Sequence, residues 1–208
     1  MCEAYAARTG TRRNLAALRA RGWRLMVSAY GDHRAEGFPY ALDNGAWSAH
    51  QAGQPWQPER FERLIAQLGP GADFVIAPDL VAGGRDSLRL TEAWLPRLEG
   101  IGRRRLIAVQ DGMEPPDVAP LLGDSVGIFV GGSTAWKLAT MASWGELARQ
   151  RGAWCHVGRV NTTRRVLMCI RAGAHSFDGS SASRFALSLP ALDHARRQLA
   201  LSWVAEKR

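Results

Sequence analysis

Short apolar runs alternate with longer amphipathic segments along most of the chain. Seven runs predict β-strands, at residues 25–29, 38–42, 74–77, 106–109, 126–130, 154–157 and 175–177. Apolar residues spaced three and four apart predict helices at residues 12–21, 59–68, 86–98, 118–122, 135–151 and 162–172, with a last helix at 187–204 broken near Pro190. Strands that alternate with helices are typical of a parallel α/β fold.

The number of strands favours one domain over residues 1–208, a compact (β/α)8 TIM-type barrel without a zinc subdomain. Such a barrel needs an eighth strand, which is expected to be missing, degenerate or near residues 185–189. With 208 residues the chain is near the lower limit of about 200–250 residues for this fold, so its loops must be short. A doubly wound open sheet is the alternative. That fold usually has a G-x-G-x-x-G turn after its first strand, where this chain has Ser28-Ala29-Tyr30-Gly31.

Polar residues and glycines stand where several of the predicted strands end. Three runs end on an aspartate, at Asp43, Asp79 and Asp178, one ends on Gln110, and one ends on Gly131-Gly132. An α/β barrel carries its chemistry at the carboxyl ends of its strands, so these residues are expected to share one pocket. The pattern therefore favours an enzyme.

The chain is basic, and its positive charge is nearly all arginine. Lys and Arg total 27 against 19 Asp and Glu, which gives a net charge of +8, and lysine occurs only at Lys137 and Lys207. Arginine binds phosphate oxygens in a bidentate fashion, so the composition favours a nucleic-acid partner. A GC-rich genome that favours arginine codons is the alternative explanation.

Several classes of protein are disfavoured by composition. The three cysteines form no C-x-x-C pair and the five histidines show no H-x-x-x-H spacing, so we expect no metal and no other cofactor. No apolar stretch approaches the about 18–20 residues of a transmembrane helix. The first residues lack the basic-then-apolar order of a signal peptide, so we expect a cytoplasmic protein without a membrane partner.

Asp43 and Asp178 are the candidate catalytic pair. Two carboxylates on different strand ends can divide the work of glycosidic chemistry, one as the nucleophile and one as the proton carrier. The alternatives are a helix-capping role for Asp178, which precedes Gly179, and a plain Asp-Asn-Gly turn at Asp43. Trp47 follows that turn and suits stacking on a planar base, although a place in the core is the other interpretation.

Asp79 and Gln110 suggest what is bound. Guanine offers N–H donors at N1 and N2, which suit a carboxylate, and an O6 acceptor, which suits an amide N–H. Gly131 and Gly132 would add backbone N–H donors and allow a close approach of the ligand. A phosphate-binding barrel loop and a tight turn are the alternatives for this glycine pair.

Taken in chain order, the strand-end motifs resemble the guanine transglycosylase superfamily, which includes the queuine and archaeosine tRNA-ribosyltransferases. They look closest to its short members, which insert 7-deazaguanine bases into phage or bacterial DNA. The motifs that carry the resemblance are Asp43-Asn44-Gly45-Ala46-Trp47, Ala77-Pro78-Asp79, Val109-Gln110-Asp111-Gly112, Phe129-Val130-Gly131-Gly132-Ser133, His156-Val157-Gly158-Arg159 and Ser176-Phe177-Asp178-Gly179.

The resemblance implies a base exchange at C1′ of a nucleotide. It makes Asp178 the nucleophile that forms a covalent glycosyl–enzyme intermediate, and Asp43 the general acid and base. Asp79 and Gln110 would read the purine edge, and the glycine pair would donate to O6. Trp47 would stack on one face of the base, and Cys155 would cover the other. Arg184 would contact a phosphate. Arg159 and Lys137 also follow predicted strand ends, so apart from the resemblance we expect them to face the same side and to bind the nucleic acid.

Departures from the superfamily favour DNA as the substrate over tRNA. The sequence has no Cys-x-Cys-x-x-Cys zinc motif, which the tRNA enzymes carry, and we expect no appended RNA-binding domain. We therefore expect a DNA guanine transglycosylase that uses a free 7-deazaguanine such as preQ0, in bacterial or phage-infected cytoplasm, with homodimerisation possible. The alternatives are a tRNA-guanine transglycosylase, a base-releasing N-glycosidase and a non-catalytic nucleic-acid-binding barrel.

Overall fold

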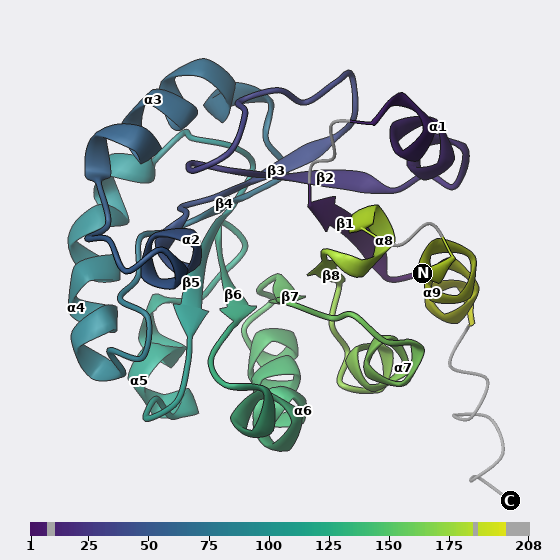
Figure 1. Ribbon diagram of the computed structural model, residues 1–208. Coiled ribbons are helices and arrows are strands. Elements are labelled where there is room, and N and C mark those ends of the chain that lie inside the picture. The colour runs from purple at the N-terminus through teal and green to yellow at the C-terminus, as the bar shows by residue number, and fades with distance from the viewer. Residues whose placement is uncertain (8–10, 185–186, 199–208) are drawn as a thin grey trace, which may run out of the picture.

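A computed structural model describes residues 1–7, 11–184 and 187–198 and places eight parallel strands in a closed barrel (Figure 1). The strands are β1 (Glu3–Ala7), β2 (Arg24–Ser28), β3 (Tyr40–Asp43), β4 (Val75–Ile76), β5 (Arg105–Val109), β6 (Val126–Val130), β7 (Cys155–Val157) and β8 (Ser176–Gly179). Each strand pairs with the next, and β8 pairs with β1 to close the barrel. The predicted α/β (β/α)8 fold is confirmed, and the open-sheet alternative is wrong.

The strand that completes the barrel is β1, at the beginning of the chain rather than near residues 185–189. Its sequence, Glu-Ala-Tyr-Ala-Ala, is rich in alanine, which has a low strand propensity, and this is why the apolar pattern did not reveal it. The strand forms because it pairs with both β2 and β8, with Tyr5 opposite Asp178. In the range expected for an eighth strand, residues 185–186 lie outside the described part, and Ser188 and Leu189 belong to a helix.

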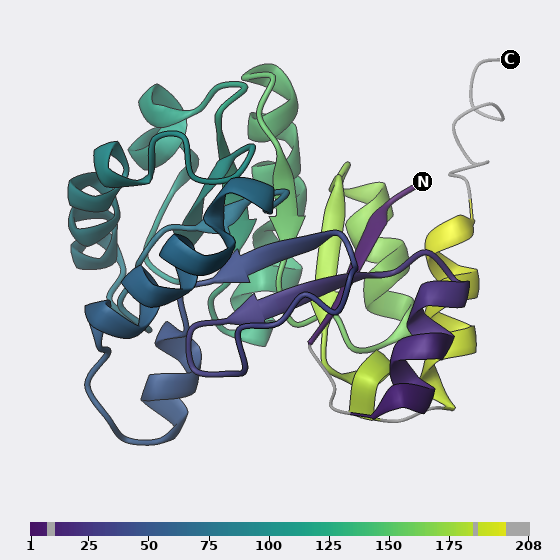
Figure 2. The same cartoon turned by 90° about the horizontal axis from the view of Figure 1, so that it is seen from above.

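Helices surround the strands, as both views of the ribbon show (Figures 1 and 2). They are α1 (Arg12–Ala20), α2 (Ala46–Gln51), α3 (Pro58–Leu68), α4 (Arg85–Trp94), α5 (Pro115–Val118), α6 (Thr134–Gln150), α7 (Thr163–Arg171), α8 (Ser181–Arg184) and α9 (Ser188–Arg197), with short 3-10 turns η1 (Gly69–Gly71), η2 (Pro96–Leu98) and η3 (Ala119–Leu121). The side chains of Thr11, Ser133 and Thr162 accept backbone N–H bonds at the starts of α1, α6 and α7.

The predicted helices differ from the structure in several places. The helix expected at residues 118–122 is α5 followed by η3, and α8 was not predicted. Helix α2 follows β3 directly and was not predicted, because its six residues are too few to show a helical period. Helix α9 passes through Pro190 without the expected break. Pro190 lies in the first turn, where a backbone N–H has no partner within the helix. The expected continuation to residue 204 extends past residue 198 and lies outside the described residues.

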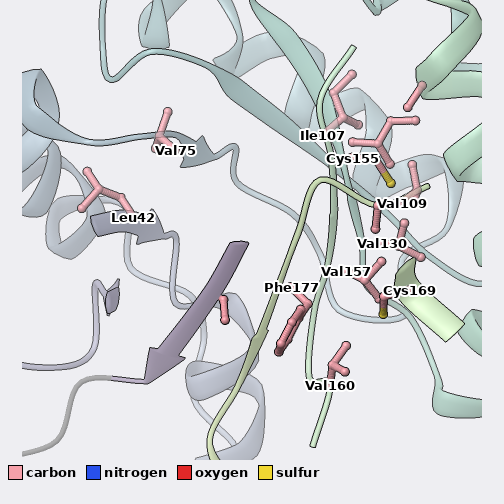
Figure 3. Packing of buried hydrophobic residues seen from close by; sticks show 14 of the residues in the cluster. Leu42, Val75, Ile107, Val109, Val130, Cys155, Val157, Val160, Cys169 and Phe177 are labelled. Carbon is pink, nitrogen blue, oxygen red and sulfur yellow. The ribbon is translucent and has the colours of Figure 1, made fainter. Parts of the chain in front are cut away.

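The core has two layers, because successive strand residues point to opposite sides of the barrel wall. Outward side chains such as Leu42, Ile107 and Val130 pack under the helices (Figure 3). Inward side chains, among them Tyr5, Phe74 and Ile76, fill the barrel itself.

Charged groups close the amino-terminal end of the barrel. Arg24 donates to Asp73 at 2.7 Å and to Glu3 at 3.1 Å, and the Tyr5 hydroxyl donates to Asp73 at 3.1 Å. This network occupies the end opposite the strand-end aspartates.

Candidate active site

A cavity of about 490 Å3 opens at the carboxyl ends of the strands. A cavity of this size matches those that bind small ligands. Strands β2 to β8 and the segments that follow them form its wall. The lining residues are Met26, Asp43, Asn44, Trp47, His50, Ile76, Asp79, Val81, Ala82, Gln110, Asp111, Phe129, Gly131, Gly132, Ser133, Arg159 and Asp178. The three strand-end aspartates named by the sequence thus face one space.

Asp43 is the last residue of β3, and its carboxylate accepts the Gly45 backbone N–H at 3.2 Å. The carboxyl group meets the cavity on one side and protein on the others. This burial raises its pKa to about 6; hydrogen bonds from Gly45 and Ser28 oppose the rise, and the negative charge of Asp178 adds to it. A carboxyl group with such a pKa can both hold and release a proton near neutral pH.

Asp178 lies in β8, and both of its oxygens have hydrogen-bond donors. His156 Nε2 lies 3.1 Å from Oδ1, and the backbone N–H of Arg159 donates to Oδ2 at 3.4 Å. The side chain remains 19% exposed toward the cavity. Because donors hold both oxygens, the carboxylate has a defined orientation.

Asp79 follows β4 and is oriented by Asn44, which the sequence analysis did not single out. Asn44 Nδ2 donates to Asp79 Oδ1 at 2.8 Å and to the Ala77 carbonyl at 2.7 Å, while Asn44 Oδ1 accepts the Ala46 N–H. Burial raises the pKa of Asp79 to about 6; the bond from Asn44 opposes the rise, and the charge of Asp43 adds to it. Asn44, the neighbour of Asp43 in the chain, therefore orients the Asp79 carboxyl group.

Gln110 follows β5 and is 4% exposed. Its Nε2 donates to the Leu80 carbonyl at 2.8 Å. That bond uses one of the two amide hydrogens, so the other hydrogen and the amide oxygen stay available for a ligand.

Of the two backbone N–H groups of Gly131 and Gly132, which follow β6, only one is available to donate to a ligand. The Gly131 N–H donates to the Val109 carbonyl at 2.9 Å, so Gly132 carries the N–H left for a ligand among the described residues. Gly132 has a φ of +67°, and a Cβ there would lie 2.7 Å from both Asp111 and Trp136. Asp111 accepts from the N–H and hydroxyl of Ser133, at 2.6 and 2.7 Å, and so fixes this loop.

Trp47 extends from α2 over the mouth of the cavity and is 40% exposed. Its ring stacks on His50 with 5.7 Å between ring centroids. The turn that leads to it needs glycine, because Gly45 has a φ of +80° and a Cβ there would lie 2.4 Å from the Tyr30 ring.

Three predicted site residues do not line the cavity. Cys155 is buried in the outer core layer with Ile107 and Val109 (Figure 3), whereas Phe129 provides an apolar wall of the cavity. Lys137 is 4% exposed and donates to the Gly158 carbonyl; burial, with a contribution from Arg159, lowers its pKa to about 8. Arg184 is exposed at the end of α8, away from the cavity lining.

His156 is, after Asn44, a second functional candidate that the sequence did not single out. It lies in the His156-Val157-Gly158-Arg159 motif, and no spacing of residues along the sequence marks it as functional. The inward orientation of its side chain, which brings it beneath Asp178, follows from the pairing of His156 with Ser176 across β7 and β8.

No known family model matches this sequence, and no curated protein matches it either. Among the described residues, no group of three or more His, Cys, Asp or Glu side chains is arranged to hold a metal ion. Every helix within those residues is too short or too polar to cross a lipid bilayer.

Proposed function

We propose that this protein is a DNA guanine transglycosylase, which replaces guanine in DNA with a 7-deazaguanine base of the preQ0 type. The observation that carries the proposal is the shared cavity of Asp43, Asp79 and Asp178, with Gln110 on the same wall and Trp47 at the mouth. Two of these carboxyl groups have pKa values raised to about 6 by burial, a feature that clusters at functional sites.

The substrate base would enter the cavity after leaving the helical stack, because C1′ is inaccessible to in-line attack while the base is stacked. Unstacking costs a few kcal/mol. Stacking on an aromatic ring such as Trp47 offsets about 1–3 kcal/mol of that cost.

The purine edge would be read by the polar groups on the β4 and β5 ends. Asp79 would accept from N1–H and N2–H₂, and the remaining Gln110 amide hydrogen and the Gly132 N–H would donate to O6. Asn44 supports this role because it fixes the Asp79 carboxylate through a 2.8 Å hydrogen bond.

The reaction would proceed in two displacements at C1′. In the first, a carboxylate oxygen of Asp178 forms a bond to C1′ as the C1′–N9 bond breaks, and guanine takes the bonding pair and a proton from Asp43. In the second, the incoming base gives a proton to Asp43 and bonds to C1′, and the electron pair of the C1′–O bond returns to Asp178. Atoms and electrons balance, and Asp43 ends as it began.

Phosphate binding would rest on Arg159, which is partly buried, and on Arg184, which is exposed. Arg159 lies at the cavity mouth, and Arg184 lies beyond β8. Lys137 is buried and donates to the Gly158 carbonyl, so it is not proposed to contact phosphate. Contacts of this kind make nucleic-acid binding fall steeply with salt.

The test is incorporation of radiolabelled guanine or preQ0 into double-stranded DNA, single-stranded DNA and tRNA, with the Asp178→Asn variant in parallel. Label that enters DNA only with the wild-type enzyme supports the proposal. Label in tRNA alone would change the substrate and keep the chemistry. Release of free guanine without incorporation of label would identify an N-glycosidase. If no label is incorporated and no guanine is released, and nucleic-acid binding survives the loss of both Asp43 and Asp178, the protein is a binding module.

A further inference from the structure

A chain of partly or fully buried side-chain hydrogen bonds ends on Asp178. Trp154 Nε1 donates to Ser176 Oγ at 2.9 Å, Ser176 Oγ lies 2.8 Å from His156 Nδ1, and His156 Nε2 lies 3.1 Å from Asp178 Oδ1. Ser176 and His156 are both 0% exposed. The chain therefore runs through the interior of the barrel, beneath the cavity.

The chain fixes which nitrogen of His156 carries the proton. An ionised Asp178 carboxylate only accepts, so Nε2 must carry hydrogen, and a neutral imidazole then accepts at Nδ1. The Ser176 hydroxyl donates to Nδ1 and accepts from the Trp154 indole N–H, which is a donor only. Each donor has an acceptor when His156 is neutral with its proton on Nε2.

Packing fixes the imidazole plane as well. The rings of Tyr5, Phe74 and Phe129 surround His156 at centroid distances of 5.6, 4.9 and 5.3 Å, and Phe129 lies nearly parallel to it at 12°. The imidazole thus holds Asp178 from a rigid position.

The order Ser176–His156–Asp178 resembles the triad of a serine hydrolase, but Ser176 has no exposed surface through which a substrate could reach it. Asp178 is the end that meets the cavity. The reactive group of the chain is therefore the carboxylate.

We propose that His156 is a positioning residue that holds Oδ1 of Asp178 throughout the reaction, so that Oδ2, which accepts only the longer 3.4 Å bond from the Arg159 N–H, forms the bond to C1′. This inference rests on the proposed function. In the glycosyl intermediate Oδ1 is the ester carbonyl oxygen. When the C1′–Oδ2 bond breaks, negative charge returns to the carboxylate and the hydrogen bond from His156 strengthens, so His156 speeds breakdown of the intermediate more than its formation.

The variants His156→Phe and His156→Gln separate this role from packing. Phenylalanine fits the aromatic surroundings and removes the donor, while glutamine restores an N–H near the Nε2 position. Phe74→Leu loosens the same ring cluster and leaves the hydrogen bond in place. For each variant, base exchange is measured together with the share of enzyme in an SDS-stable adduct with DNA at steady state.

We expect His156→Phe to lower exchange about tenfold to a hundredfold, since a hydrogen bond to a charged group contributes about 1.5–3 kcal/mol. The adduct share should rise severalfold, and His156→Gln should restore both within about threefold. Phe74→Leu should lower Tm without raising the adduct share. Two results would overturn the role of His156. One is base exchange in His156→Phe at the wild-type rate. The other is a His156→Phe variant that neither exchanges base nor accumulates the adduct, with an equally inactive His156→Gln.

A second measurement does not depend on activity. In enzyme labelled with 15N-histidine, two-bond 1H–15N spectra report which ring nitrogen is protonated, and the His156→Phe spectrum assigns the signal. A neutral ring with its proton on Nε2 is expected, and a proton on Nδ1 would overturn the inference. If wild-type enzyme labels no polymer, the proposed function fails, while this spectrum still decides whether His156 holds Asp178.

Discussion

The guanidinium of Arg159 lies 4.3 Å from the centroid of the Trp47 ring, across the mouth of the cavity. Arg159 also donates to the Gly132 carbonyl, so side chains and backbone from the connections after β3, β6 and β7 meet at this point. Its backbone has a φ of +58°, an uncommon conformation for a residue other than glycine. A base that stacks on the same face of Trp47 must displace the guanidinium, which would then be free to contact a phosphate.

Mutating Trp47 and Arg159 one at a time should show that Trp47 contributes to binding of the base and Arg159 to binding of the DNA polymer. Trp47→Ala should weaken guanine binding by about 1–3 kcal/mol, with Trp47→Phe close to wild type. Arg159→Gln should bind free guanine at least as tightly as the wild type, because the substitution removes the guanidinium that covers the Trp47 ring. It should reduce the slope of log Kd against log salt for DNA by about 1. Calorimetry with guanine and salt titrations with DNA test both expectations, and equal effects of the two variants on both ligands would contradict them.

The rate of adduct formation should depend on the protonation of Asp43. Burial raises its pKa to about 6, and departure of guanine needs its proton, so the single-turnover rate should fall as pH rises through about 6. Asp43→Asn should be slower by about 10²–10⁴-fold and should lack this dependence. Rapid-quench measurements of the adduct between pH 5 and 8 provide the check. A wild-type rate that rises over the same range would remove Asp43 from the role of acid.

Asp43 should also make the fold less stable at neutral pH. Its folded-state pKa of about 6 lies above the ordinary value of 3.8, so the native state binds the proton more tightly and stability falls as pH rises from about 4 to about 6. Asp43→Asn should therefore raise the free energy of unfolding at pH 8 by on the order of 1–3 kcal/mol and change little at pH 4. Urea unfolding at both pH values is the measurement. Asp86→Asn, in an exposed ion pair with Arg89, is the control and should shift stability little at either pH.

Asp79 should decide which purine binds. Asp79→Ala removes the acceptor for N1–H and N2–H₂ and should weaken guanine binding about tenfold to a hundredfold, with a smaller loss for hypoxanthine, which lacks the N2 amine. Asn44→Ala should have a weaker effect in the same direction, because it frees the Asp79 carboxylate. Asp124→Ala, before β6 at the other end of the barrel, serves as the control. Unchanged selectivity in Asp79→Ala would exclude this residue from the binding edge.

Gly145→Ala should destabilise the protein although it lies within helix α6. Alanine is favoured over glycine in a helix by about 1 kcal/mol, but a Cβ at Gly145 would lie 1.8 Å from the Ala172 carbonyl oxygen. The helix must shift away from the end of α7, and overpacking of this kind costs about 1–3 kcal/mol. Thermal unfolding against the exposed Ser143→Ala variant of the same helix measures the difference, and a higher Tm for Gly145→Ala would refute the contact.

The alternation of strands and helices, and the aspartates at the ends of β3, β4 and β8, could be predicted because they depend on local pattern alone. Apolar runs and helical spacing are visible within a few residues, and parallel strands in a barrel bring their carboxyl ends to one side. Asp43, Asp79, Gln110, Trp47 and Asp178 therefore line the predicted pocket. Their chemical roles stay predictions.

Only the tertiary structure decided which face of each strand points inward and which distant segments pair. Cys155 and His156 are neighbours in one short strand, and its sequence does not say which of them faces the barrel interior. The register of β7 against β6 and β8 places His156 inside, beneath Asp178, and Cys155 outside in the core. The alanine-rich β1 becomes a strand because β8, at the far end of the chain, lies beside it. The sequence by itself determined the repeating units and the polar residues at their ends, whereas barrel closure and side-chain direction depend on pairing between residues far apart in the chain.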